Sequence, residues 1–120
     1  MRFIPTLAAI ALTLAGSAVY AQKSQLLVYT ALETDQIKAY QDGFAKVEPN
    51  IEIKWVRDST GIIAAKLLAE KANPQADAVM GVAASSLALL DKNGMLEPYA
   101  PLNLDAIMSQ YRDQKSPPPW

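Results

Sequence analysis

The residues of this chain with the clearest chemical potential lie in the turn Asp58-Ser59-Thr60-Gly61. Two adjacent hydroxyl side chains precede a glycine, and a segment with helical spacing begins at that glycine. A helix start leaves backbone N–H groups unpaired under a partial positive charge, so it binds anions and phosphate-like groups in particular. The alternative is that Ser59 or Thr60 only caps its own helix, which is the commoner use of these residues.

A strand before this turn and a helix after it must hold it in place. Ile51, Ile53 and Trp55 alternate as in a strand over 51–56, and Ile63 and Leu67 have helical spacing. The same alternation occurs on both sides of this unit along the chain. We predict strands at 25–30, 51–56 and 76–80, and helices at 33–47, 61–72 and 86–92. This order is typical of an α/β fold with a mostly parallel sheet.

Smaller features complete the predicted fold. The buried stripe of the first helix consists of Ile37, Tyr40, Phe44 and Val47. Tyr29 and Trp55 are expected in the core, because they stand at core spacings rather than in turns. A short edge segment at 95–99, weakened by a proline, and a final short helix at 104–111 follow.

Three predicted turns reach the edge of the sheet where ligands bind in open parallel sheets, beyond the carboxyl ends of the strands. They span residues 30–33, 58–61 and 82–85. Thr30 and Ser85 add hydroxyls to this edge, and Glu33 adds a carboxylate. Any α/β protein needs helix starts at these places, so each residue also has a purely structural interpretation: Glu33 favours the helix dipole, and Ser85 caps a helix.

Composition excludes several classes of function. The chain contains no cysteine and no histidine, which removes disulfides, thiolate metal sites and the commonest general base. Basic and acidic residues number 11 and 12 and are mixed along the chain, so nucleic acid is not expected as a partner. No carboxylate pair with catalytic spacing is evident unless folding joins Asp58 to Glu33. We therefore expect a protein that is not an enzyme and uses no cofactor or metal.

The N-terminus reads as a cleavable export signal. Arg2 precedes the apolar run 7–14, and Val19-Tyr20-Ala21 resembles a cleavage site of the small-residue type. We therefore predict a signal peptide over 1–21 and export to the periplasm. A retained anchor is the alternative, although the run is short for a membrane span. At the other end, Pro117-Pro118-Pro119 before Trp120 is typical of a connector, which indicates a truncated sequence.

Three stretches of the chain resemble the first lobe of a periplasmic solute-binding protein of an ABC importer: 27–33, 55–61 and 76–83. The chain is similar to the cluster that contains ferric-iron and 2-aminoethylphosphonate binding proteins, and 94–99 and 118–120 fit as well. The resemblance implies a periplasmic-binding-protein type II fold in two lobes that close on a ligand. It implies that a monomer delivers this ligand to an inner-membrane permease. Residues 22–120 would then be a first-lobe portion, truncated before the second lobe.

The residues at the sheet edge favour a phosphonate as the ligand. Ferric-binding members of the cluster typically have a histidine shortly after the first strand, where this chain has Thr30-Ala31-Leu32-Glu33. Ferric iron held by carboxylate and phenolate oxygens remains an alternative, as does a fragment that binds nothing. A tetrahedral oxyanion suits the hydroxyl turn, and an acidic side chain suits an attached ammonium. The predicted ligand-binding residues are Thr30, Glu33, Asp58, Ser59, Thr60, Gly61 and Ser85.

In this interpretation each residue has a role toward 2-aminoethylphosphonate. Ser59, Thr60 and Gly61 hold the phosphonate, Thr30 and Ser85 add hydrogen bonds, and Glu33 faces the amine, with Asp58 as the other carboxylate able to pair with it.

Overall fold

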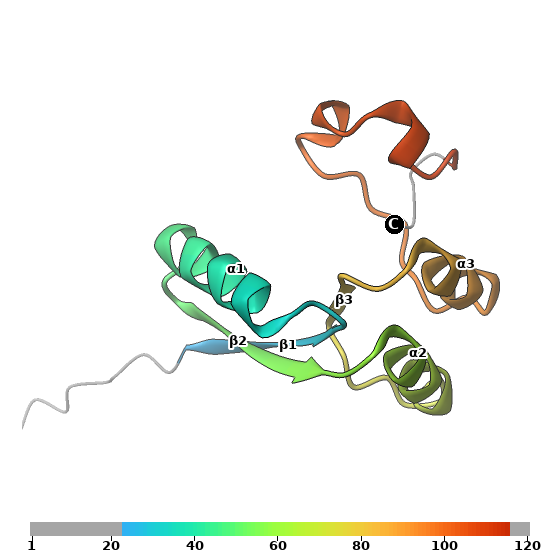
Figure 1. Cartoon of the computed structure of the whole chain (residues 1–120), viewed down its shortest axis with the longest axis horizontal. Helices are drawn as coiled ribbons and strands as arrows, with labels where there is room; N and C mark the ends of the chain where they lie inside the picture. The colour runs from blue at the N-terminus through green and yellow to red at the C-terminus, as the bar shows by residue number, and fades with distance from the viewer. Residues whose placement is uncertain (1–22, 116–120) are drawn as a thin grey trace, which may run out of the picture.

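The computed structural model describes residues 23–115, so the predicted signal peptide and the proline run before Trp120 lie outside the described residues. Strands and helices alternate along the chain (Figure 1). They are β1 Ser24–Thr30, α1 Thr34–Val47, β2 Ile51–Arg57, α2 Thr60–Ala69, β3 Ala78–Met80 and α3 Ala84–Lys92, followed by the short 3-10 turns η1 Leu104–Ala106 and η2 Ser109–Tyr111. The predicted order of strands and helices is confirmed.

The three strands form one parallel sheet in the order β2-β1-β3. Tyr29 of β1 stands opposite Val56 of β2 and Val79 of β3. The central strand is the most buried, since Val28, Tyr29 and Thr30 expose almost nothing. This confirms the predicted α/β fold with a parallel sheet, and it places the carboxyl ends of all three strands at one edge.

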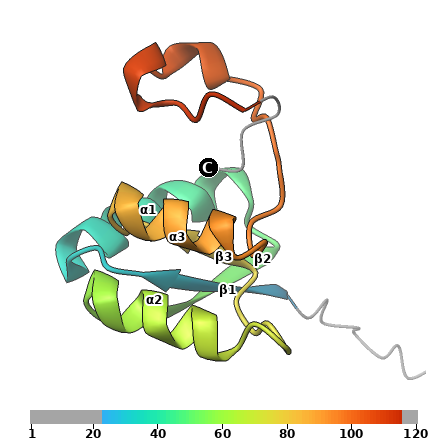
Figure 2. The same ribbon diagram turned by 90° about the vertical axis from the view of Figure 1, so that its right-hand side faces the viewer.

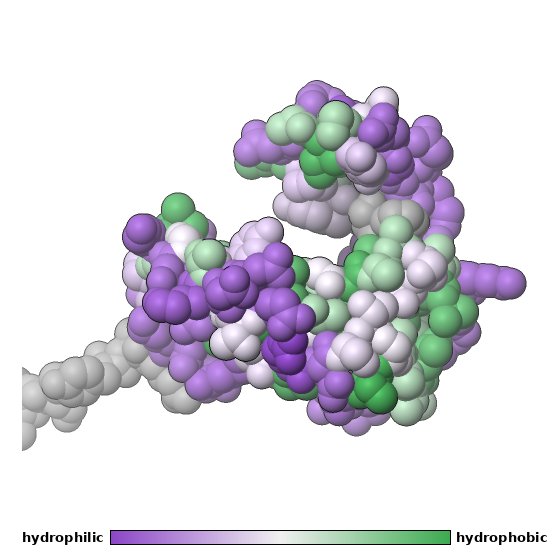
Figure 3. Space-filling view, viewed as in Figure 1, coloured by the Kyte–Doolittle hydropathy of each residue, from purple (hydrophilic) through white to green (hydrophobic). Residues whose placement is uncertain are grey.

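Helices α1 and α2 lie on opposite sides of the sheet, and α3 packs against α2 (Figure 2). Ile63 of α2 and Leu90 of α3 are fully buried. Apolar residues gather over the region of α2 and α3, whereas polar residues cover the region of α1 (Figure 3). The packing of α2 with α3 thus leaves other apolar residues of this region at the surface.

A polar cluster ties α2 to the central strand. The Tyr29 hydroxyl donates to Glu70 and lies 3.2 and 3.1 Å from its two carboxylate oxygens. Lys66 Nζ lies 2.6 Å from Glu70 Oε1 and 5.2 Å from the centroid of the Tyr29 ring. The hydrogen bond from Lys66 lowers the pKa of Glu70, and the same bond raises the pKa of Lys66. The hydroxyl of a buried tyrosine is thus satisfied by a charged partner.

The predicted stripe of α1 is only partly correct. Ile37 is buried and Phe44 half-buried, but Tyr40 and Val47 are 55% and 72% exposed. α1 contacts β2, which is an edge strand of the sheet, so within residues 23–115 no further strand lies beyond it to extend the surface that α1 packs on. Tyr29 lies in the core as predicted, and Trp55 is half-buried.

The end of the described chain also differs from the prediction. Residues 95–99 form no strand, and 104–111 form two 3-10 turns in place of one helix. The two turns are separated by extended backbone at Ile107 and Met108, with ψ of 130° and 135°. The Arg112 side chain donates to the carbonyls of Ile107 at 2.6 Å and Asp105 at 3.2 Å and so links the two turns. Within residues 23–115 no helix is long and apolar enough to cross a membrane.

Candidate functional site

Three turns meet at the carboxyl edge of the sheet, as the sequence predicts: 31–33, 58–59 and 81–83. The Asp58 N–H donates to the Thr30 carbonyl at 3.1 Å, which joins the β2–α2 turn to the end of β1. On the other side, Gly81 adopts a left-handed φ of 66° directly against the side chain of Leu32. The end of β1 and the β1–α1 turn together therefore contact both neighbouring turns.

The hydroxyl turn is open at the start of α2. Ser59 is the N-cap residue, but its side chain makes no capping hydrogen bond, and Thr60 is the first residue of the helix. Asp58 Oδ1 accepts the Ser59 N–H at 2.7 Å instead. A Cβ placed on Gly61 would meet no atom within 4 Å. The Ser59 hydroxyl therefore does not cap its own helix, and the space beside the Gly61 Cα is open.

Two other predicted residues occupy the same edge in different ways. The Thr30 side chain is fully buried, and its Oγ1 accepts the Leu32 N–H at 3.1 Å, so it shapes the β1–α1 turn. Ser85 is exposed as the second residue of α3. The N-cap of that helix is Ala83, so Ser85 is not its cap residue.

Glu33 lies in an ion pair with Arg57, a residue that the sequence prediction does not contain. Arg57 Nη2 lies 2.5 Å from Glu33 Oε2, and Arg57 Nε donates to the Leu32 carbonyl at 2.7 Å. Both side chains remain accessible, with 41% of Arg57 and 72% of Glu33 exposed. Its position in the sequence could have indicated this role, because Arg57 is the last residue of β2 and directly precedes the hydroxyl turn.

The edge thus combines the groups that bind a small charged molecule. Arg57 supplies a cation, Glu33 and Asp58 supply carboxylates, and the start of α2 supplies hydroxyl and N–H donors. A guanidinium and a helix start both favour an oxyanion, whereas a carboxylate favours a cation. Within the described part of the chain, no group of three or more acidic side chains comes together to hold a metal ion.

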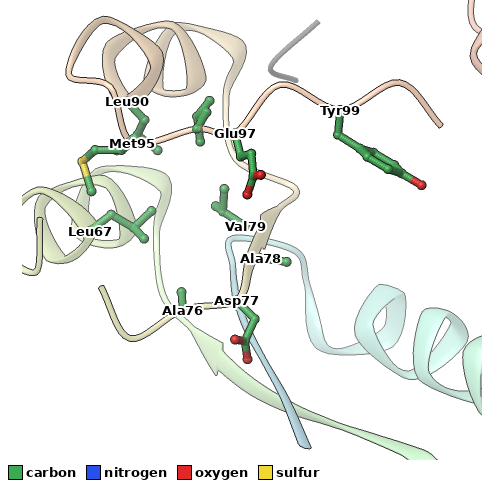
Figure 4. A pocket seen from close by; sticks show the side chains of 10 residues that line it. Leu67, Ala76, Asp77, Ala78, Val79, Leu90, Met95, Glu97 and Tyr99 are labelled. Atoms are coloured by element: carbon green, nitrogen blue, oxygen red, sulfur yellow. The ribbon is translucent and has the colours of Figure 1, made fainter. Parts of the chain in front are cut away.

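A pocket of about 560 Å³ lies away from this edge, near the start of β3 (Figure 4). Its walls are largely apolar and include Leu67, Val79, Leu90 and Met95. Asp77, which also lines it, is committed to the fold, because its carboxylate accepts the Leu27 N–H at 2.8 Å. The pocket offers no anion donors comparable to those of the hydroxyl turn.

Comparison with known proteins identifies the architecture. No family model matches the chain. The Probable ABC transporter periplasmic-binding protein y4fP of Sinorhizobium fredii is 42% identical over 62 residues, which cover 52% of this chain and 17% of that protein. The solved periplasmic binding protein P5PA is 29% identical with a TM-score of 0.67, over 74% of this chain and 28% of that one.

A second solved structure is periplasmic binding protein AfuA from Actinobacillus pleuropneumoniae with exogenous fructose-6-phosphate bound. It is 28% identical, with a TM-score of 0.68 over 73% of this chain and 27% of that one. The chain has the fold of part of a type II periplasmic binding protein. It spans less than a third of the length of these relatives and structural neighbours.

Proposed function

We propose that this chain is the first-lobe portion of the substrate-binding component of an ABC importer. The protein captures 2-aminoethylphosphonate or a close relative between two lobes and delivers it to the permease as a monomer, without catalysing a reaction. The fold and the similarity to periplasmic binding proteins of ABC transporters support the class. A signal peptide over 1–21 and a location in the periplasm belong to the same proposal.

The observation that carries the proposal is the open start of α2 beside a cation. The Ser59 hydroxyl makes no bond to its own helix, and Arg57 ends the strand directly before it. Ser59, Thr60 and the Gly61 N–H donate to the phosphonate oxygens. The Glu33 side chain is 72% exposed even in its pair with Arg57. This exposure supports the proposed contact of its carboxylate with the ammonium of the ligand.

The remaining predicted residues take supporting roles. Ser85 adds a hydrogen bond from the start of α3, and Asp58 orders the turn through the Ser59 N–H. Thr30 acts from beneath, by holding the Leu32 N–H.

A hexose phosphate is a second candidate, because AfuA carries fructose-6-phosphate in its solved structure. Its phosphoryl group accepts hydrogen bonds from the start of α2 in the same way as a phosphonate does. It has no ammonium, however, and so makes no use of the Glu33 carboxylate, which keeps Arg57 as its partner. Ferric iron is the alternative that the family resemblance leaves open.

Calorimetric titration of the mature protein, produced from its complete gene, tests the proposal with 2-aminoethylphosphonate, fructose 6-phosphate and ferric citrate in parallel. Thr60→Val keeps the side-chain shape and removes the hydroxyl, so the phosphonate affinity should fall about tenfold. Ser109→Ala, on the distant η2 turn, is the control and should bind normally. If the protein bound iron or the hexose phosphate but gave no binding signal with the phosphonate, the proposed ligand would be wrong. The proposal that the protein belongs to an ABC importer would be unaffected.

A further inference from the structure

We propose that Arg57 is a positioning residue, which fixes the β1–α1 turn beside the start of α2 and thereby assembles the binding edge. Its effect on ligand affinity rests on the proposed function, whereas its effect on the turn does not. The residue is absent from the set of ligand-binding residues predicted above, and its role follows from its contacts.

Arg57 uses two separate donors on two adjacent residues of another turn. Nε reaches the Leu32 carbonyl at 2.7 Å, and Nη2 reaches Glu33 Oε2 at 2.5 Å. The planar guanidinium presents both donors in a fixed fork, which a lysine ammonium on a flexible stem cannot reproduce. The two bonds therefore add a link to β2 to the local bonds from Thr30 and Gln36 that hold the chain as it enters α1.

Leu32 extends this link to the third turn. Its carbonyl is held by Arg57, and its side chain packs where a Cβ on Gly81 would lie, 2.3 Å from Leu32 Cγ. The fit exists only because residue 81 is a glycine. Arg57, Leu32 and Gly81 thus join the turns that follow all three strands into one unit.

A second ion pair on β2 offers a comparison, because it does not connect two turns. Lys54 Nζ lies 2.6 Å from Glu52 Oε1, and both side chains are 47% exposed. The two residues stand two positions apart on β2 and join no separate elements. Exposed pairs of this kind add little to stability, so Lys54→Ala is a matched control for loss of a lysine or arginine charge from β2.

Hydrogen exchange in the absence of ligand tests the positioning directly. The Leu32 N–H donates to Thr30 Oγ1, and the Glu33 N–H donates to Gln36 Oε1 at 2.9 Å, so both amides report whether the turn is closed. In the mature protein, Arg57→Ala and Arg57→Lys should each speed exchange at these amides about tenfold. Lys54→Ala should leave them unchanged.

The affinity for 2-aminoethylphosphonate, measured on the same variants, separates positioning from charge. Arg57→Lys keeps the charge and should keep the melting temperature of the wild type, because the ion pair is exposed, yet it should bind about tenfold more weakly. Unchanged exchange in Arg57→Ala, or full affinity in Arg57→Lys, would overturn the proposal. So would faster exchange spread over the whole sheet with a lower melting temperature. Faster exchange confined to the turn, in a protein that binds no phosphonate, would support the positioning and refute the proposed ligand alone.

Discussion

Substitution of Gly81 by alanine tests the packing of the three turns against each other. Gly81 and Gly94 have nearly the same left-handed backbone, with φ of 66° and 67°. They differ in their surroundings: a Cβ on Gly81 would lie 2.3 and 2.5 Å from two Leu32 carbon atoms, whereas a Cβ on Gly94 would meet nothing within 4 Å. Gly94→Ala therefore reports the backbone strain alone, and Gly81→Ala reports strain plus overpacking.

The magnitudes follow from these two terms. A left-handed backbone costs a residue with a Cβ about 1–2 kcal/mol, so Gly94→Ala should lower the free energy of unfolding by that amount. Overpacking adds about 1–3 kcal/mol, so Gly81→Ala should lower it by about 2–5 kcal/mol in all. In a Leu32→Ala background the overpacking disappears, and Gly81→Ala should again cost about 1–2 kcal/mol.

Urea unfolding of the four variants and the wild type measures these differences, with the slope checked for constancy. The mature protein from its complete gene is the material. Equal costs for Gly81→Ala and Gly94→Ala would refute the contact between Leu32 and Gly81. An unchanged cost of Gly81→Ala in the Leu32→Ala background would do the same.

Further predictions concern the ion pairs. Tyr29→Phe should lower the free energy of unfolding by about 1 kcal/mol, because it removes the hydroxyl that donates to Glu70. Urea unfolding measures this difference. The pKa of Glu70 is lowered by Lys66, so the stability difference between wild type and Glu70→Gln should be present above pH 4.5 and vanish as the pH falls below it. Asp91 raises the pKa of Lys115, so the advantage over Lys115→Met should persist below pH 10.5 and vanish as the pH rises beyond it. Thermal melts across pH check both, and a constant difference would contradict the assignment.

The order of elements was predictable because each depends on local spacing. Apolar runs at 25–30 and 51–56 form β1 and β2, and the parallel sheet follows from the alternation with helices. Burial of individual residues was less predictable. Tyr40 and Val47 have the spacing of a buried stripe, yet both are exposed on a helix that packs on an edge strand, and spacing alone does not show where a sheet ends.

The candidate site likewise has one part that was predictable from the sequence and one part that was not. The hydroxyl turn at 58–61 was visible because its residues are neighbours in the chain. Arg57 was not, since its partners lie 24 and 25 residues away and only the pairing of β1 with β2 brings them together. The predicted helix at 104–111 is likewise interrupted by extended backbone at Ile107 and Met108, which the spacing of apolar residues did not indicate.

A crystal structure of the mature protein with 2-aminoethylphosphonate would show directly whether the start of α2 holds the ligand. We expect the phosphonate within hydrogen-bond distance of the Ser59 and Thr60 hydroxyls and the Gly61 N–H, with the ammonium of the ligand toward Glu33. A ligand held away from the start of α2, for example in the apolar pocket beside Leu67, would contradict this expectation.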